Sequence, residues 1–215
     1  MTSTEPTVFV VDDDDQARES ICALATSMNV RSESFSSAED FLHSYENDRP
    51  GCLVSDLRLP GMSGLELLTR LRERNITLPT VLLTAYARTP VTVEAMKKGA
   101  LTILDKPYHD DDLWQAIREA LAEDASRRNE RQWRQDVHAR LARLNAAERD
   151  VLERILEGKP NKVIAQELAV SVRTVENRRH DILVKMRAGS VAELVRMVVQ
   201  SGDDPASVRT RPPQD

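Results

Sequence analysis

The sequence has few aromatic residues and few cysteines, and each scarcity excludes a class of protein. Aromatic side chains make up only 4% of the 215 residues, which argues against a single-strand nucleic-acid binder built on stacked rings. The two cysteines, Cys22 and Cys52, lie far apart without a Cys-x-x-Cys pattern, and the four histidines are dispersed. We therefore interpret both cysteines as buried apolar residues and expect no disulfide or metal framework.

Long apolar runs are also missing. No window reaches the roughly 18 apolar residues of a membrane-spanning helix. The start, MTSTEPT, lacks the basic and apolar regions of a secretory leader. We therefore expect a cytoplasmic protein without a membrane partner.

The net charge of −5 hides an uneven distribution of charge along the chain. Residues 1–123 hold 21 Asp and Glu against 12 Lys and Arg, whereas residues 124–215 hold 14 against 18. An acidic half followed by a basic half predicts two domains with different partners.

Strand-like and helix-like segments alternate through the first half. Each predicted strand is followed by a helical pattern, and the strands are 7–11, 31–35, 51–56, 79–85 and 101–107. Five such β/α units predict an α/β fold, a flavodoxin-like five-stranded parallel sheet with helices on both faces, over residues 1–124.

Residues 125–144 are strongly charged but keep a helical period. Trp133, Val137, Leu141 and Leu144 recur at helical spacing. We interpret the segment as a helical linker that extends the preceding helix, with an interruption near 126–130. A solvated interdomain helix and a helix that pairs with its copy in a dimer both fit this pattern.

From Asn145 onward the pattern is wholly helical, and residues 145–200 predict an all-α domain of four helices. Asn145 and Glu148 have capping-box spacing at the first helix. A short helix from Asn161, a tight turn and a longer basic helix capped by Ser171 predict a helix-turn-helix. The tail, 201–215, lacks packing residues and is expected to be disordered.

Four consecutive carboxylates, Asp12 to Asp15, follow the first predicted strand. Two explanations are open at this point. Acidic side chains are favoured where a helix begins, because of the helix dipole and the unpaired backbone donors. Carboxylates crowded at a strand end also bind Mg²⁺.

The ends of the other strands favour a cation. Asp56 ends the third strand, Thr84 the fourth, and Lys106 lies at the end of the fifth; in an open α/β sheet these ends meet at one edge. A carboxylate can attack a phosphoryl group. Mg²⁺ held by Asp13 and Asp56 would neutralise the developing charge, and Lys106 would hold phosphoryl oxygens. The Thr84 hydroxyl could donate to the same group.

These motifs occur together in a known family. VVDDDD, VSDLRLPGMSGLEL, LLTA and DKP match receiver-domain motifs in order and spacing, and the segment that begins LNAAERDVLERILEGKPNKV resembles a LuxR-type helix-turn-helix. The chain thus resembles the two-component response regulators of the NarL/FixJ subfamily. The resemblance implies a regulator that a sensor histidine kinase phosphorylates and that then dimerises. The dimer would bind the major groove of double-stranded DNA and regulate transcription with RNA polymerase.

The resemblance also assigns roles to residues of the first half. It makes Asp56 the phosphoacceptor, assisted by Lys106 and Thr84, and it implies no enzyme beyond phosphorylation and dephosphorylation of this aspartate. The Mg²⁺ ligands that it implies are Asp12, Asp13, Asp56 and the backbone carbonyl of Arg58. For Asp14 and Asp15 we keep the helix-start explanation.

One position departs from the receiver pattern. Receivers usually carry an aromatic switch residue three positions before the lysine, and here that position is Ile103. Because isoleucine is shorter and stiff at its first torsion, we expect Tyr86, two positions after Thr84, to change its environment instead.

The helix from Ser171 is the expected major-groove reader, although a basic helix can also be merely solvated. Its predicted inward stripe is Val175, Ile182, Leu183 and Met186. The resemblance places three side chains at base-reading positions: Glu176, Asn177 and His180. The expected phosphate contacts are Lys162, Arg173, Thr174 and Arg178.

Two other functions fit part of the sequence. A phosphatase of the haloacid dehalogenase kind would use Asp12 of the Asp-x-Asp after the first strand as its nucleophile, but it leaves Asp56 and the basic half unexplained. The other is a DNA-binding regulator that works without phosphorylation.

Overall fold

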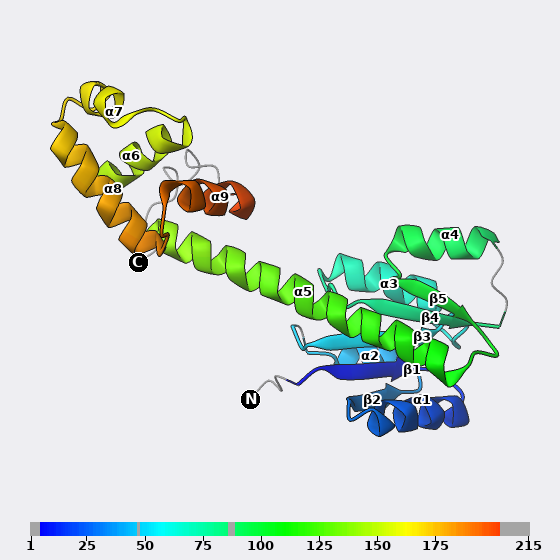
Figure 1. The fold of residues 1–215 in the computed structure, drawn as a ribbon. Coiled ribbons are helices and arrows are strands. Elements are labelled where there is room, and N and C mark those ends of the chain that lie inside the picture. The colour runs from blue at the N-terminus through cyan, green and yellow to red at the C-terminus, as the bar shows by residue number, and fades with distance from the viewer. Residues whose placement is uncertain (1–4, 47, 86–88, 203–215) are drawn as a thin grey trace. The chain divides into compact units, whose positions relative to one another are not determined.

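The computed structural model describes residues 5–46, 48–85 and 89–202 (Figure 1). The chain divides into two compact units, Met1–Arg128 and Asn129–Asp215, which are described one at a time. Helix α5, Asp110–Ala142, contributes residues to both.

A sheet of five parallel strands forms the centre of the first unit. The strands are β1 (Thr7–Val11), β2 (Arg31–Phe35), β3 (Gly51–Asp56), β4 (Thr80–Thr84) and β5 (Thr102–Asp105). Their order is β2-β1-β3-β4-β5. Every adjacent pair is parallel. The predicted flavodoxin-like sheet is therefore confirmed.

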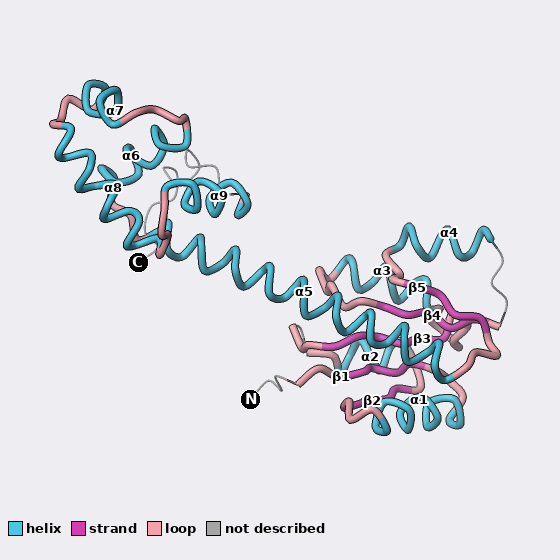
Figure 2. Tube along the Cα trace, in the orientation of Figure 1, coloured by secondary structure: helices cyan, strands magenta, loops and turns pink. Residues whose placement is uncertain are grey.

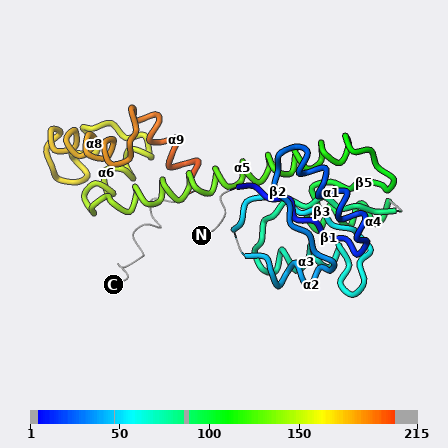
Figure 3. The backbone as a smooth tube through the Cα atoms, turned by 90° about the horizontal axis from the view of Figure 1, so that it is seen from below, coloured from blue at the N-terminus to red at the C-terminus, as the bar shows by residue number. Residues whose placement is uncertain are grey.

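Helices cover both faces of this sheet because successive strand residues point to opposite sides. Besides α5 they are α1 (Asp15–Ser27), α2 (Ala38–Ser44), α3 (Gly64–Glu73) and α4 (Thr89–Lys98). Val8 and Val10 share a buried cluster with Ile21 of α1 and Ile117 of α5. The alternate residue Phe9 packs with α2 and α3 in another cluster, on the side of the sheet away from α5 (Figure 3).

Helix α5 runs without a break through 33 residues, so the predicted interruption near 126–130 is wrong. The charged composition that suggested a break instead supplies helix-stabilising pairs one turn apart. These i,i+4 ion pairs are Arg127–Glu123, Arg128–Asp124 and Arg134–Glu130.

The second unit is entirely helical in its described part (Figure 2). After α5 come α6 (Ala146–Leu156), α7 (Asn161–Glu167), α8 (Val172–Met186) and α9 (Val191–Ser201). The predicted four-helix domain is confirmed. Helix α9 includes Ser201, and residues 203–215 of the predicted tail lie outside the described residues.

The core of this unit also includes the end of α5 and Leu144, two residues beyond that helix. Val137, Leu141 and Leu144 are buried there, and Trp133 packs against the same cluster. This part of the predicted linker is therefore packed rather than solvated. Among the described helices, none is both long and apolar enough to span a membrane.

Candidate functional site

Four polar side chains lie at the carboxyl ends of β1, β3, β4 and β5. Asp12 directly follows β1, Asp56 and Thr84 end β3 and β4, and Lys106 directly follows β5. Asp12 and Asp56 are 2% and 8% exposed. Two carboxylates buried this deeply need partners, because an unpaired buried charge is strongly destabilising.

Lys106 is the partner that the two carboxylates share. Its Nζ atom donates to Asp12 Oδ2 at 2.8 Å and to Asp56 Oδ1 at 2.6 Å. Burial disfavours the ammonium, but the hydrogen bonds with Asp12 and Asp56 outweigh burial and raise the pKa of Lys106 above its ordinary value. The lysine is thus charged at neutral pH, and the site joins side chains that lie 94 and 50 residues apart.

Backbone amides hold the remaining carboxylate oxygens. The Arg58 N–H donates to Asp56 Oδ2 at 2.6 Å, and the Asp14 N–H donates to Asp12 Oδ1 at 3.0 Å. Arg18 Nη1 donates to the Asp12 carbonyl at 2.6 Å. Both carboxylates are thereby fixed in orientation before any ligand arrives. The contribution of Arg18 was missed, although its place on the first turn of the following helix is visible in the sequence.

The four consecutive aspartates divide into two pairs. Asp12 is buried in the site and Asp13 is exposed beside it in the sequence. Asp14 is the N-cap of α1, and its side chain accepts from the Gln16 N–H. Asp15 lies in the first turn and pairs with Arg18. The helix-start explanation is confirmed for Asp14 and Asp15.

The donor set suits a hard cation such as Mg²⁺ in its chemistry, since Asp12, Asp13 and Asp56 all offer carboxylate oxygens. Among the described residues, however, no three acidic, histidine or cysteine side chains are grouped closely enough to form a metal site as they stand. The Lys106 ammonium lies between the two buried carboxylates instead.

A glutamate of α2 holds the loop that follows Asp56. Glu39 Oε1 accepts from the Met62 N–H at 3.0 Å. Gly61 has a φ of 77°, and a Cβ there would lie 2.9 Å from the same Glu39 oxygen. Ser63 then caps α3 with a capping box through Glu66. Glu39 was not predicted, because a contact across 23 residues of sequence leaves no local pattern.

The two predicted switch positions differ in what is described. Ile103 lies on β5 opposite Leu82 and packs, half-buried, against a cluster that includes Leu68 of α3 and Ala95 of α4. Tyr86 lies outside the described residues. The Lys106–Pro107 peptide bond is cis.

The second unit presents one face of α8 to solvent. The predicted inward residues Val175, Ile182 and Met186 are buried, and Leu183 packs against the same core. The predicted base-reading side chains are all exposed: Glu176, Asn177 and His180. Of the predicted phosphate contacts, Lys162 and Arg173 are exposed and Thr174 and Arg178 are half-buried. Apart from the two half-buried residues, this face is open to a partner.

Both halves of the chain match known domain families. Residues 8–118 match the response regulator receiver domain, and residues 142–198 match the luxR family of bacterial regulatory proteins. The chain is a response regulator of the NarL/FixJ subfamily. It is 40% identical to the transcriptional regulatory protein FixJ of Azorhizobium caulinodans, over 94% of this chain and 96% of that one. A second relative, the transcriptional regulatory protein TdiR of Thauera aromatica, is 38% identical over 93% and 88%.

Solved structures agree with this assignment. The response regulator StyR superposes with a TM-score of 0.82 at 39% identity, covering 91% of this chain and 99% of that one. Full-length FixJ from B. japonicum gives 0.57 at 36% identity, covering 93% and 98%. The receiver domain implies a histidine kinase as partner, and the luxR-type domain implies binding to DNA. The phosphatase alternative finds no support.

Two partly buried polar contacts stabilise the helix-turn-helix of this response regulator. Arg179 Nη1 donates to Asn161 Oδ1 at 2.6 Å and so ties α8 to the start of α7. Lys185 Nζ donates to both carboxylate oxygens of Glu148, each at 2.7 Å. Glu148 also accepts from the Asn145 N–H, completing the predicted capping box. Burial disfavours the carboxylate, but the Lys185 and Asn145 hydrogen bonds outweigh burial and lower the pKa of Glu148.

Proposed function

We propose that Asp56 accepts a phosphoryl group from a phosphohistidine of a sensor kinase. The P–N bond of the donor, whose other ring nitrogen carries a proton, breaks and a P–O bond to the Asp56 carboxylate forms, which leaves an aspartyl phosphate and a neutral imidazole. The observation that carries this proposal is the buried pair Asp12 and Asp56, which share Lys106 at 2.8 and 2.6 Å. Asp56 lies at the carboxyl end of β3, and ligands of open α/β sheets bind at the carboxyl ends of the strands.

The surrounding residues would divide the remaining tasks. Lys106 would follow the negative charge onto the phosphoryl oxygens, and the Thr84 hydroxyl would donate to one of them. The Arg58 N–H keeps the second Asp56 oxygen in place. Asp12, Asp13, Asp56 and the Arg58 carbonyl would hold Mg²⁺. When bound, this ion neutralises charge that accumulates between the carboxylate and the incoming phosphoryl group.

Phosphorylation would then control DNA binding. It replaces the single charge of the Asp56 carboxylate with a phosphate of roughly −1.5 to −2 charges, and we infer that this shifts an existing equilibrium of the receiver toward a homodimer. The dimer would place two copies of α8 in successive major grooves and act with RNA polymerase in the cytoplasm.

Acetyl phosphate with Mg²⁺ tests the assignment of the phosphoacceptor. The intact protein should gain one phosphate by mass spectrometry, Asp56→Asn should gain none, and chelation of the metal should stop incorporation. Asp111→Asn, which changes an exposed aspartate at the start of α5, serves as the matched control. A phosphate gain that persists in Asp56→Asn would overturn the proposal.

A further inference from the structure

A cavity opens in the first unit at the start of β4, at the opposite end of this strand from Thr84. It encloses about 320 Å³ between the last turn of α3, the 75–78 loop, the start of β4, the end of α4 and Arg127 of α5. Thr80 begins β4 beside this cavity and Thr84 ends the strand at the phosphoacceptor. The cavity is therefore distinct from the site built on Asp56.

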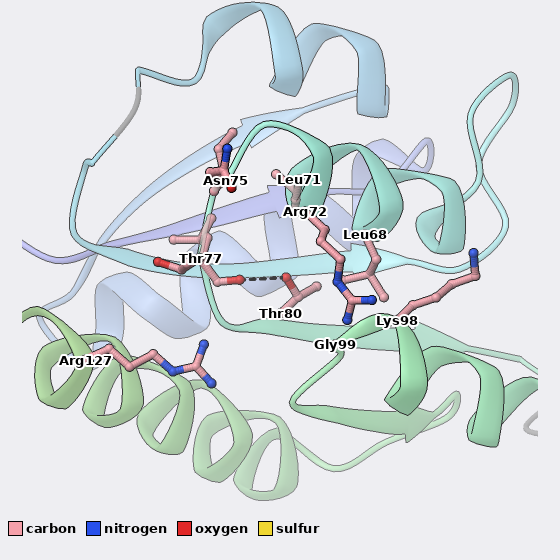
Figure 4. A pocket seen from close by; sticks show the side chains of 11 residues that line it. Leu68, Leu71, Arg72, Asn75, Thr77, Thr80, Lys98, Gly99 and Arg127 are labelled. Carbon is pink, nitrogen blue, oxygen red and sulfur yellow. Dashed lines mark hydrogen bonds between the residues drawn. The ribbon is translucent and has the colours of Figure 1, made fainter. Parts of the chain in front are cut away.

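The polar lining of the cavity is basic. Arg72, Lys98 and Arg127 come from three different helices, and no carboxylate lies among the lining residues. Arg72 Nη2 donates to the Lys97 carbonyl at 3.1 Å, and Arg127 Nε donates to Glu123 at 2.6 Å. These contacts orient both guanidinium groups, which lie on either side of Thr80 in Figure 4.

Donor capacity is left over on these guanidinium groups. Among the described residues, the two terminal nitrogens of Arg127 have no hydrogen-bond partner, because only its Nε atom is engaged. Gly99 also leaves room here: its φ is 98°, and a Cβ would lie 3.4 Å from Arg72 Nη2. The Lys98 ammonium is already engaged, because it donates to Thr69 Oγ1 at 2.9 Å and lies 3.9 Å from Glu94 Oε1.

The rest of the lining is apolar. Leu68, Leu71 and Leu78 are almost fully buried, and Ile76 is half-buried beside them. A volume of this size is at the lower limit for small-molecule sites, which combine an apolar lining with a few fixed polar groups. An inorganic ion would leave the exposed part of Ile76 uncovered, and a neutral apolar molecule would leave the guanidinium groups without an anion.

We propose that this cavity binds a small organic anion, with its carboxylate or phosphate on Arg72 and Arg127 and its apolar part on the leucine wall. Planar guanidinium groups suit such anionic groups because they donate two hydrogen bonds in parallel. The site would give the receiver a chemical input separate from phosphorylation.

Titration of the full chain with heptanoate tests the proposal, with heptan-1-ol and inorganic phosphate as matched probes. We follow the amide NMR signals of Asn75, Thr77 and Gly99 without any phosphodonor, so failure here leaves the assignment of Asp56 untouched. Heptanoate should give saturable shifts at about millimolar concentration, and each control probe should bind at least about five-fold more weakly. Equal binding of the alcohol would overturn the role of the arginines. Equal binding of phosphate would overturn the role of the leucine wall.

Variants separate the cavity from general surface charge. Arg72→Gln and Arg127→Gln should each weaken heptanoate binding about five-fold, and Thr77→Trp should block the cavity without removing a charge. Arg118→Gln removes an exposed arginine of the same helix that is not part of the lining, and it should bind heptanoate as the intact protein does. Wild-type affinity in Arg127→Gln and Thr77→Trp would overturn the proposal.

Discussion

At the residue scale, Lys106 decides the charge of the strand-end site. Two carboxylates and one ammonium leave the group with a net charge of −1. On phosphorylation the single charge of the Asp56 carboxylate is replaced by the roughly −1.5 to −2 of its phosphate, so the group becomes more negative by up to about one charge. Lys106 already donates to both carboxylates at 2.8 and 2.6 Å, so it cannot neutralise the added charge alone. A divalent cation would restore the balance, which is why we expect phosphorylation to depend on Mg²⁺.

The switch of the receiver is a second question at this scale. We predict that Tyr86→Ala speeds loss of the phosphate and weakens phosphorylation-dependent dimerisation, whereas Ile103→Val changes neither. Ile103 packs against α3 and α4 in a fixed cluster, and the substitution removes only one methylene from it. Phosphate lifetime is measured with labelled protein and dimerisation by sedimentation. The reverse pattern, with Ile103→Val alone affecting both, would place the switch at position 103.

Glu148 gives a prediction with a pH dependence. Its carboxylate is 5% exposed and bonded to Lys185 and Asn145, so Glu148→Gln should lower the free energy of unfolding of the second unit by about 1–2 kcal/mol at pH 7. Because the folded pKa is lowered, this stabilisation is present above the unfolded value of 4.5 and is lost as the pH falls through the folded value.

Urea unfolding from pH 7 down to pH 3 measures that difference. Glu193→Gln, a glutamate near the start of α9 with a more exposed site, is the comparison. If the gap between Glu148→Gln and the intact protein stays constant across this range, the carboxylate charge contributes nothing to stability.

At the element scale, α7 and α8 are expected to contribute differently to DNA affinity and to sequence specificity. Asn177 is exposed on the helix, whereas Lys162 is exposed on α7. Positively charged side chains bind the phosphate backbone of DNA, whereas side chains with a defined pattern of hydrogen-bond donors and acceptors recognise the bases. The two residues therefore predict different kinds of loss.

Lys162→Ala should weaken binding to every DNA sequence and flatten the salt dependence by about one unit of slope. Asn177→Ala should cost about 1–3 kcal/mol on the preferred site only. Fluorescence anisotropy at several salt concentrations, with specific and random duplexes, distinguishes the two. An equal loss on all duplexes from Asn177→Ala would mean that α8 is oriented differently from our prediction.

A network around Asp124 anchors α5 at the other end of the sheet. Asp124 is buried and accepts from the Gly51 N–H at 2.9 Å and from Arg128 Nε at 2.7 Å. The two terminal nitrogens of Arg128 donate elsewhere, Nη2 to the Arg49 carbonyl at 2.6 Å and Nη1 to Asp48 Oδ1 at 2.9 Å. The start of β3 and the middle of α5 are thus held together by contacts across more than 70 residues.

At the scale of the whole molecule, local signals were readable in the sequence and distant contacts were not. The five strands, the Asn145 cap and the helix-turn-helix follow from periodicity and capping residues, and the strand-end aspartates follow from topology. The Arg128 network and the Glu39 contact join residues far apart in sequence, so no local sequence pattern predicts them. The continuity of α5 was not predicted, because a strongly charged composition is also typical of interdomain linkers. The i,i+4 ion pairs are what stabilise this segment as a helix.

Helix α5 contributes residues to the cores of both units, and this determines where the chain can be divided into fragments that fold. Arg128 belongs to the receiver network, whereas Val137 and Leu141 belong to the core of the second unit.

We predict that a fragment 1–128 melts as one cooperative unit and that 1–124, shortened by four residues, melts at a lower temperature. A fragment 129–202 should fold, and one that begins at 145 should not, because it lacks Leu144 as well as the α5 residues. Circular dichroism melts of the four fragments check this, and a stable 145–202 fragment would contradict it. The cuts that preserve both folds therefore fall inside a continuous helix rather than in a loop.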